Sequence, residues 1–151
     1  MLSIIITAWK EKVSIRKSIS SIVLAAKDIN DSIKIIQISP DDETLDAGKQ
    51  EFEKNDNNKI SLLQIKDPQK GKPLALNLAR KEIVGDIVLL TDGDVFVDKD
   101  SIKLILDKFD DEKVGGVSGH PVSRDPRSTM WGYYSHLFTD AIHQDRERLK
   151  N

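Results

Sequence analysis

Two carboxylates flank a glycine at Asp92-Gly93-Asp94, directly after the apolar run at residues 87–90. Two acids held together at the edge of an apolar core destabilise the fold unless a cation offsets their charge. Mg²⁺ and Mn²⁺ prefer such hard oxygen ligands and commonly bridge them to phosphates. The tripeptide therefore predicts a divalent-metal site. The alternative is an ordinary polar turn, because Asp-Gly is common turn chemistry.

A basic loop and one aromatic side chain add features of nucleotide binding. Lys70-Gly71-Lys72 precedes Pro73, a residue favoured in the first turn of a helix, and a helix start attracts anions such as a diphosphate. Trp9 follows the first apolar run and can stack on a base. Each feature has a plainer interpretation. The lysines can belong to a solvated loop, and Trp9 can simply pack against the protein.

Apolar runs alternate with helical patterns along the chain. Strands are predicted at residues 2–7, 33–38, 60–65, 86–90 and 114–118, and helices at residues 15–29, 44–54, 73–83, 101–109 and from 128 onward. Nearly continuous apolar strands separated by helices predict an α/β fold with a mostly parallel sheet flanked by helices. The run at 86–90 is the most apolar, so we expect it to be the most deeply buried. Ligands of such sheets bind at the carboxyl ends of the strands, where Trp9 and Asp92 stand.

The composition narrows the class of protein. The 151 residues suit one domain, and a net charge of −2 gives no field that would attract nucleic acid. The absence of cysteine excludes disulfides, and only three histidines disfavour a three-histidine metal site. No apolar run is long enough to span a bilayer. We expect a cytoplasmic protein, with membrane association only through parts or partners outside this chain.

Four segments resemble motifs of the family 2 glycosyltransferases, which have the GT-A fold. Residues 3–11 (SIIITAWKE) are similar to the family's first strand and the turn after it. Residues 71–77 (GKPLALN) resemble its GK-x-x-ALN segment, and residues 85–94 (GDIVLLTDGD) its GDIV-x-x-x-D-x-D strand and metal motif. Residues 114–119 (VGGVSG) resemble the strand that follows. The match covers most of residues 2–120, in the family's order.

The resemblance implies a Rossmann-like GT-A nucleotide-diphospho-sugar transferase fold with a donor site. The implied cofactor-binding and metal-binding residues are Thr7, Ala8, Trp9, Glu11, Asp41, Lys72, Asp92 and Asp94. In the family's pattern the first four border the nucleoside, and the lysine lies near the nucleotide. Asp94 holds Mn²⁺ or Mg²⁺ at the donor diphosphate, and Asp92 contacts the ribose or the metal.

The end of the second strand departs from the family's pattern. Family members typically carry Asp-Asp-Gly-Ser there, whereas this chain has Ser39-Pro40-Asp41-Asp42. The residue that contacts the base is therefore either Ser39 or Asp41. We choose Asp41 as the expected contact.

The resemblance also implies that the chain is one half of a transferase. We expect residues 1–151 to form a single donor-binding domain, with a nucleotide-binding core at 1–120. A helical segment at 121–151 would lead to an acceptor half that is missing from this truncated chain. The family's catalytic base, a carboxylate, belongs to that half, so the catalytic residue is unknown here. The expected partners are a UDP-sugar, an unidentified acceptor, and either a second copy of the chain or the missing half.

Two function classes remain open on the sequence alone. The first is a glycosyltransferase domain that binds a nucleoside-diphosphate sugar with a divalent metal, for inverting transfer of the sugar to an acceptor hydroxyl. The second is a non-catalytic nucleotide- or nucleotide-sugar-binding module, or a truncated, inactive fragment. Both share the whole donor site, so only turnover of a donor separates them.

The last predicted helix carries residues that a donor site does not use. His136 and His143 lie seven residues apart and so on one helix face. With no third ligand nearby, we expect them to be surface or packing residues. The aromatic residues between Trp131 and Phe138 are expected to seat the helix on the sheet or on a partner.

Overall fold

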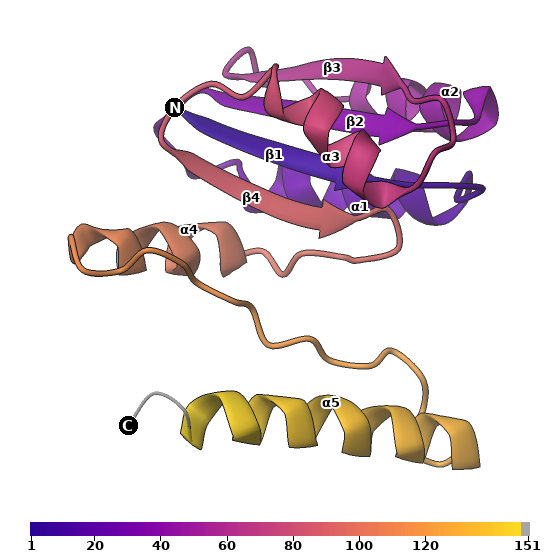
Figure 1. Ribbon diagram of the computed structural model, residues 1–151, viewed down its shortest axis with the longest axis vertical. Coiled ribbons are helices and arrows are strands. Elements are labelled where there is room, and N and C mark those ends of the chain that lie inside the picture. Colours follow the sequence, from indigo (N-terminus) through magenta and orange to yellow (C-terminus); the bar gives the residue numbers. More distant parts are fainter. Residues whose placement is uncertain (149–151) are drawn as a thin grey trace. The chain divides into compact units, whose positions relative to one another are not determined.

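The computed structural model describes residues 1–148 (Figure 1). The chain divides into two compact units, one at Met1–Asp107 and one that begins at Lys108. We describe each unit by itself. The predicted C-terminal segment 121–151 ends in residues 149–151, which lie outside the described part of the chain.

The first unit is built on a four-stranded parallel sheet with the order β3-β2-β1-β4. The strands are β1 at Leu2–Thr7, β2 at Ile33–Ser39, β3 at Ile60–Lys66 and β4 at Ile87–Asp92. The chain moves outward from β1 to β3 and then crosses back to place β4 on the other side of β1. This change of direction creates a topological switch point at the carboxyl end of β1, which is where such sheets bind ligands.

Helices cover both faces of the sheet (Figure 1). They are α1 at Ser14–Ala25, α2 at Asp42–Phe52, α3 at Lys72–Arg80 and α4 at Ser101–Leu106. A 3₁₀ turn at Asp107–Asp110 follows α4. The larger apolar core forms where α1, α2 and α4 pack on one face, and α3 packs on the other face through Ala79. The observed α/β architecture confirms the predicted parallel sheet flanked by helices.

The branched side chains of β1 and β2 explain why this sheet forms. Ile4 and Ile6 point into the larger core, while Ile5 pairs with Ile36 and Leu90 on the face covered by α3. Burying one such side chain stabilises a fold by about 1.5–3 kcal/mol. Because both faces of β1 are covered, this strand tolerates apolar residues without alternation.

The prediction that residues 86–90 form the most deeply buried strand is wrong. In the described residues β4 pairs with β1 alone and lies at the edge of the sheet. Leu90 is 63% exposed, whereas the pairing residue Ile5 is buried. The strand order decides this difference, because an edge strand has a neighbour on one side only.

The predicted strand at residues 114–118 is also absent. The segment has no regular secondary structure, and added Cβ atoms at Gly115 or Gly116 would meet no atom within 4 Å. Glycine has a low strand propensity, and an isolated segment has no ladder to pair its backbone groups. The valines of this segment therefore do not suffice to form a strand.

The second unit consists mainly of α5 at Met130–Arg148 and the segment before it. The ring of His143 stacks on that of His120 at 3.8 Å, and the Nε2 atom of buried His136 lies 2.9 Å from the carbonyl oxygen of Asp125. Both predicted histidines therefore serve packing within this unit. The aromatic side chains from Trp131 to Phe138 are exposed.

Gly85 provides a test of the turn that leads into β4. This residue has φ +80°, and a Cβ atom there would overlap the backbone carbonyl of Met1. We expect Gly85→Ala to lower the free energy of unfolding by at least about 1–2 kcal/mol, because the left-handed conformation alone costs that much. Urea denaturation measures the change. Gly115→Ala is the control and should stay within about 0.5 kcal/mol of the parent; equal effects of the two substitutions would contradict the assignment.

Candidate functional site

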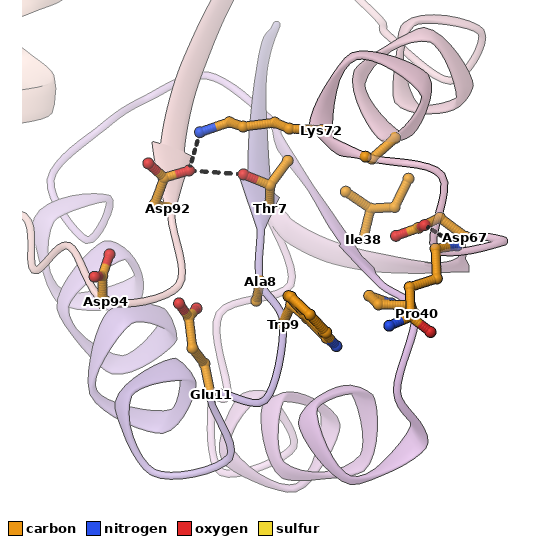
Figure 2. Close-up of a pocket in the computed structure, with 13 residues that line it drawn as sticks. Thr7, Ala8, Trp9, Glu11, Ile38, Pro40, Asp67, Lys72, Asp92 and Asp94 are labelled. Atoms are coloured by element: carbon orange, nitrogen blue, oxygen red, sulfur yellow. Dashed lines mark hydrogen bonds and ion pairs between the residues drawn. The ribbon is translucent and has the colours of Figure 1, made fainter.

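A pocket of about 480 Å³ opens at the carboxyl ends of the strands (Figure 2). Its lining residues come from the carboxyl ends of the strands, the turns that follow them and the start of α3. They are Thr7, Ala8, Trp9, Glu11, Ile38, Pro40, Asp67, Gln69, Gly71, Lys72, Ala75, Asp92 and Asp94. The structure thus brings together all the predicted site residues except Asp41. It does so at the position expected for a ligand of a parallel sheet.

The carboxylate of Asp92 accepts hydrogen bonds from groups on two other elements. The register of the sheet pairs Thr7 with Asp92, and the Thr7 hydroxyl donates to Asp92 Oδ1 over 2.7 Å. The ammonium group of Lys72 donates to the same oxygen. Burial alone would raise the pKa of Asp92, but the hydrogen bonds from Lys72 and Thr7 outweigh it and lower the pKa. Asp92 is therefore held as a carboxylate at the pocket wall.

Glu11 approaches the turn that follows β4. Its Oε2 atom is buried and has no hydrogen-bond partner. A Cβ atom at Gly93 would overlap Oε2 and the side chain of Ala8, so only glycine permits this approach. Burial raises the pKa of Glu11, and the nearby charges of Asp94 and Asp92 raise it further. The repulsion identifies a region where a positive charge would be stabilised.

The donor set suits a hard divalent cation that is shared with a ligand. Asp92 and Asp94 present carboxylate oxygens to the pocket. The Oε2 atom of Glu11, which has no hydrogen-bond partner, lies beside Gly93, the residue that separates these two aspartates in the sequence. Within residues 1–148, no group of three or more acidic, histidine or cysteine side chains converges as a complete metal cage. Mg²⁺ commonly takes one or two carboxylates and completes its shell with phosphates and water. The residues fit such an ion.

Asp41 lies beside the pocket and holds its wall. It is the N-cap of α2, where its side chain accepts from the backbone N–H of Thr44 over 2.9 Å. It also accepts from the backbone N–H of Lys10 over 2.8 Å and from the Ser39 hydroxyl over 3.0 Å. Burial would raise the pKa of Asp41, but these hydrogen bonds lower it to about 2. The carboxylate thereby ties the turn after β1 to α2.

Trp9 stands at the pocket wall on that same turn. Its side chain is 53% exposed and lines the pocket, as Figure 2 shows. The next residue, Lys10, adopts the left-handed conformation with φ 57°, and its Nζ atom lies 5.2 Å from the centre of the Trp9 ring. A cation over an indole is attracted to the ring. The turn and this contact together orient an aromatic surface toward the pocket.

Several lining residues were not assigned from the sequence. They are Ile38, Pro40, Asp67, Gln69, Gly71 and Ala75. Asp67 follows β3 directly, is only 9% exposed, and accepts from the backbone N–H of Gln69 over 2.7 Å. The rule that ligands lie at strand ends points to Asp67 as well, so a signal for it was present. The apolar lining residues carry no such signal, because nothing local distinguishes them from core residues.

The comparisons with known proteins identify the family and the fold. The family model for "Glycosyltransferase like family 2" matches residues 1–151. The chain belongs to the family 2 glycosyltransferases. Among solved structures, this domain is similar to the crystal structure of TarS from S. aureus, at 20% identity and a TM-score of 0.60 over 85% of the chain. It is also similar to the mannosyltransferase PcManGT from Pyrobaculum calidifontis in complex with GDP-Man and Mn²⁺, at 22% identity and a TM-score of 0.66 over 84% of the chain.

These similarities establish the GT-A fold for the glycosyltransferase domain. A third structure, S. aureus TarS 1-349 in complex with UDP-GlcNAc, matches at 19% identity and a TM-score of 0.60 over 85% of the chain. The domain spans 24%, 36% and 38% of the lengths of the TarS, PcManGT and TarS 1-349 chains. No curated protein matches the sequence. Within residues 1–148, none of the helices has the length and apolarity that crossing a membrane requires.

The role of Asp41 as a helix cap gives a stability prediction. We expect Asp41→Ala to lower the free energy of unfolding by about 1 kcal/mol at neutral pH, the typical cost of losing an N-cap. The folded pKa of about 2 lies below the ordinary 3.8, so this contribution is complete above about pH 4 and is lost as the pH falls toward 2. The difference between variant and parent should therefore shrink on acidification.

Urea denaturation at several pH values measures this effect. Asp46→Ala, on the exposed surface of the same helix, is the matched control. A difference between Asp41→Ala and the parent that does not change down to pH 2 would show that the capping carboxylate is not its source.

Proposed function

We propose that this domain binds a nucleoside-diphosphate sugar together with Mn²⁺ or Mg²⁺ and presents the sugar for inverting transfer to an acceptor hydroxyl. The observation that carries the proposal is the pocket itself. It combines an exposed indole at Trp9, a basic side chain at Lys72 and the two carboxylates Asp92 and Asp94. These groups match, in order, a base, a diphosphate and a divalent cation.

The nucleoside half of the donor is assigned to the side of the pocket near Trp9. Stacking on the indole is supported by its exposure and by the turn that orients it. Thr7, Ala8 and Glu11 border the same region and are proposed to contact the nucleoside. Asp41 is proposed to act through the turn that it holds. We take uracil as the base, and a carboxylate at Asp67 suits it, because uracil offers a ring N–H donor.

The diphosphate half is assigned to Lys72 and the carboxylates after β4. Lys72 begins α3, where the positive end of the helix dipole favours an anion. Asp94 and Asp92 are proposed to hold the divalent cation. When bound, this ion supplies charge neutralisation for the nucleoside-diphosphate leaving group. The complexes of related structures with GDP-Man and Mn²⁺ and with UDP-GlcNAc support this assignment for the fold.

Inverting transfer also needs a base that removes the proton of the acceptor hydroxyl. The pocket carboxylates Asp92 and Asp94 are assigned to the cation, and Glu11 and Asp67 are assigned to the nucleoside. We therefore assign no base among the described residues. We propose that the base is contributed by an acceptor-binding part outside this chain, which leaves donor binding as the function of the domain itself.

A thermal-shift experiment tests the proposed metal ligand. UDP with Mn²⁺ at about one hundred times its dissociation constant should stabilise the domain by ~2.7 kcal/mol, which raises Tm by roughly 5–10 °C. Asp94→Asn should abolish this shift. Asp86→Asn, at the other end of β4, is the control and should retain it. Stabilisation of Asp94→Asn by UDP to the same extent as the parent would refute the metal assignment.

Tryptophan fluorescence tests the base and its stacking partner. In a Trp131→Phe background, UDP should quench Trp9 and bind more tightly than ADP or CDP. Trp9→Ala, whose UDP binding is followed by thermal shift because its tryptophan signal is lost, should bind UDP about tenfold more weakly, since stacking on an aromatic is worth ~1–3 kcal/mol per base. Tighter binding of GDP than of UDP would overturn the choice of uracil. Slow donor hydrolysis that Asp94→Asn abolishes would favour the transferase domain, and metal-dependent binding without any hydrolysis would favour a non-catalytic binding module.

A further inference from the structure

The ammonium group of Lys72 lies where both Asp92 and a bound diphosphate would require a positive charge. Its ammonium group contacts Asp92 Oδ1, the oxygen that also accepts from Thr7 (Figure 2). Of the side chains that line the pocket in the described residues, Lys72 is the one basic group, against Glu11, Asp67, Asp92 and Asp94. A single ammonium cannot neutralise both Asp92 and an added diphosphate.

We propose that Lys72 is an exchangeable counter-ion: it competes with the divalent cation for Asp92 and, once displaced, binds the donor diphosphate. The competition for Asp92 rests only on the cation site of the proposed function, whereas the second part also rests on its nucleotide binding. The exchange makes the cation and the nucleotide bind cooperatively. The cation displaces the ammonium of Lys72 from Asp92, and the diphosphate then binds the displaced ammonium and keeps it away from Asp92.

The geometry supports a mobile contact rather than a structural one. Both side chains of the pair are about half exposed, at 54% for Lys72 and 44% for Asp92. An ion pair of this exposure is worth ~0–1 kcal/mol, so a divalent cation can displace it. A lysine carries its charge on a flexible four-carbon stem, which lets the ammonium move while the start of α3 stays in place.

The neighbours of Asp92 would remain suited to a cation after the exchange. Thr7 keeps its hydrogen bond to Asp92 through the register of β1 and β4. The side chain of Asp94 is exposed and makes no hydrogen bond or ion pair with other residues of the described chain. Displacement of one ammonium therefore opens a carboxylate pair to the ion. It also places a positive charge at the N-terminus of α3, where phosphate binding is favoured.

Binding of Mn²⁺ alone tests the competition directly. Electron paramagnetic resonance of free Mn²⁺, at low ionic strength and without nucleotide, gives the dissociation constant for each variant. We expect Lys72→Met to bind Mn²⁺ roughly two- to fivefold more tightly than the parent, the range that an exposed ion pair allows. Lys70→Met, which removes the same charge two residues earlier in the chain, is the matched control and should change the affinity less. Binding that persists in Asp94→Asn is adventitious and is subtracted.

Nucleotide binding tests the second half of the exchange. In the parent, UDP should tighten Mn²⁺ binding, and Mn²⁺ should tighten UDP binding by the same factor. In Lys72→Met, UDP should bind about tenfold more weakly in the presence of Mn²⁺, and this mutual factor should fall. Lys72→Arg keeps the charge and should restore both. Thermal denaturation of each variant checks that the fold is intact. Lys72→Gln removes the same charge and replaces Lys72→Met if that variant does not fold.

The outcomes separate this proposal from the proposed function. If Lys72→Met binds Mn²⁺ no more tightly than Lys70→Met, or if no Mn²⁺ binding depends on Asp94, the exchange is refuted. If the parent binds no nucleotide but Lys72→Met still binds Mn²⁺ more tightly, the competition stands and the proposed function fails. A structural role for Lys72 predicts lower stability without any gain in Mn²⁺ affinity.

Discussion

The negative charge at the carboxyl end of β4 is the constraint on which the site depends. The carboxylate of Asp92 accepts hydrogen bonds from Thr7 of β1 and from Lys72 of α3, and these bonds outweigh the effect of its partial burial on the pKa. Thr7 and Asp92 are 85 positions apart in the sequence and meet only when the β1–β4 register is formed, whereas Lys72 lies 20 positions before Asp92. Formation of the sheet and assembly of the polar site are therefore one event.

A second polar centre holds the opposite wall of the pocket. Asp41 connects the cap of α2 to the turn after β1, and Glu11 on that turn donates its backbone N–H to the Thr44 hydroxyl over 3.0 Å. These hydrogen bonds fix the turn that carries Trp9 to the start of α2. On the other side of Glu11, the absence of a side chain at Gly93 lets the turn after β4 approach Glu11. Asp41 thus holds the turn after β1 in place, and that turn presents Trp9 to the pocket.

Most of the fold could be predicted because its determinants are local. Branched apolar runs identify β1 to β4, and the helical spacing between them requires a parallel arrangement. The chemistry of the site was also visible, since Trp9, Lys72, Asp92 and Asp94 stand directly after predicted strands or at a predicted helix start. The burial of β4 and the strand at residues 114–118 were not predictable in this way. Both depend on which strands pair with these segments in the sheet, and a short stretch of sequence does not specify its partner strand.

The sequence by itself predicted most of the element types, the family and the candidate residues for binding a nucleotide and a cation. Only the tertiary structure decided what each of these residues contacts. It assigned Asp41 to a helix cap, brought Asp67 from β3 into the pocket, and paired Lys72 with Asp92. The physical reason is that propensity and periodicity act between near neighbours, whereas hydrogen bonds and ion pairs between turns require the strand order β3-β2-β1-β4 to exist first.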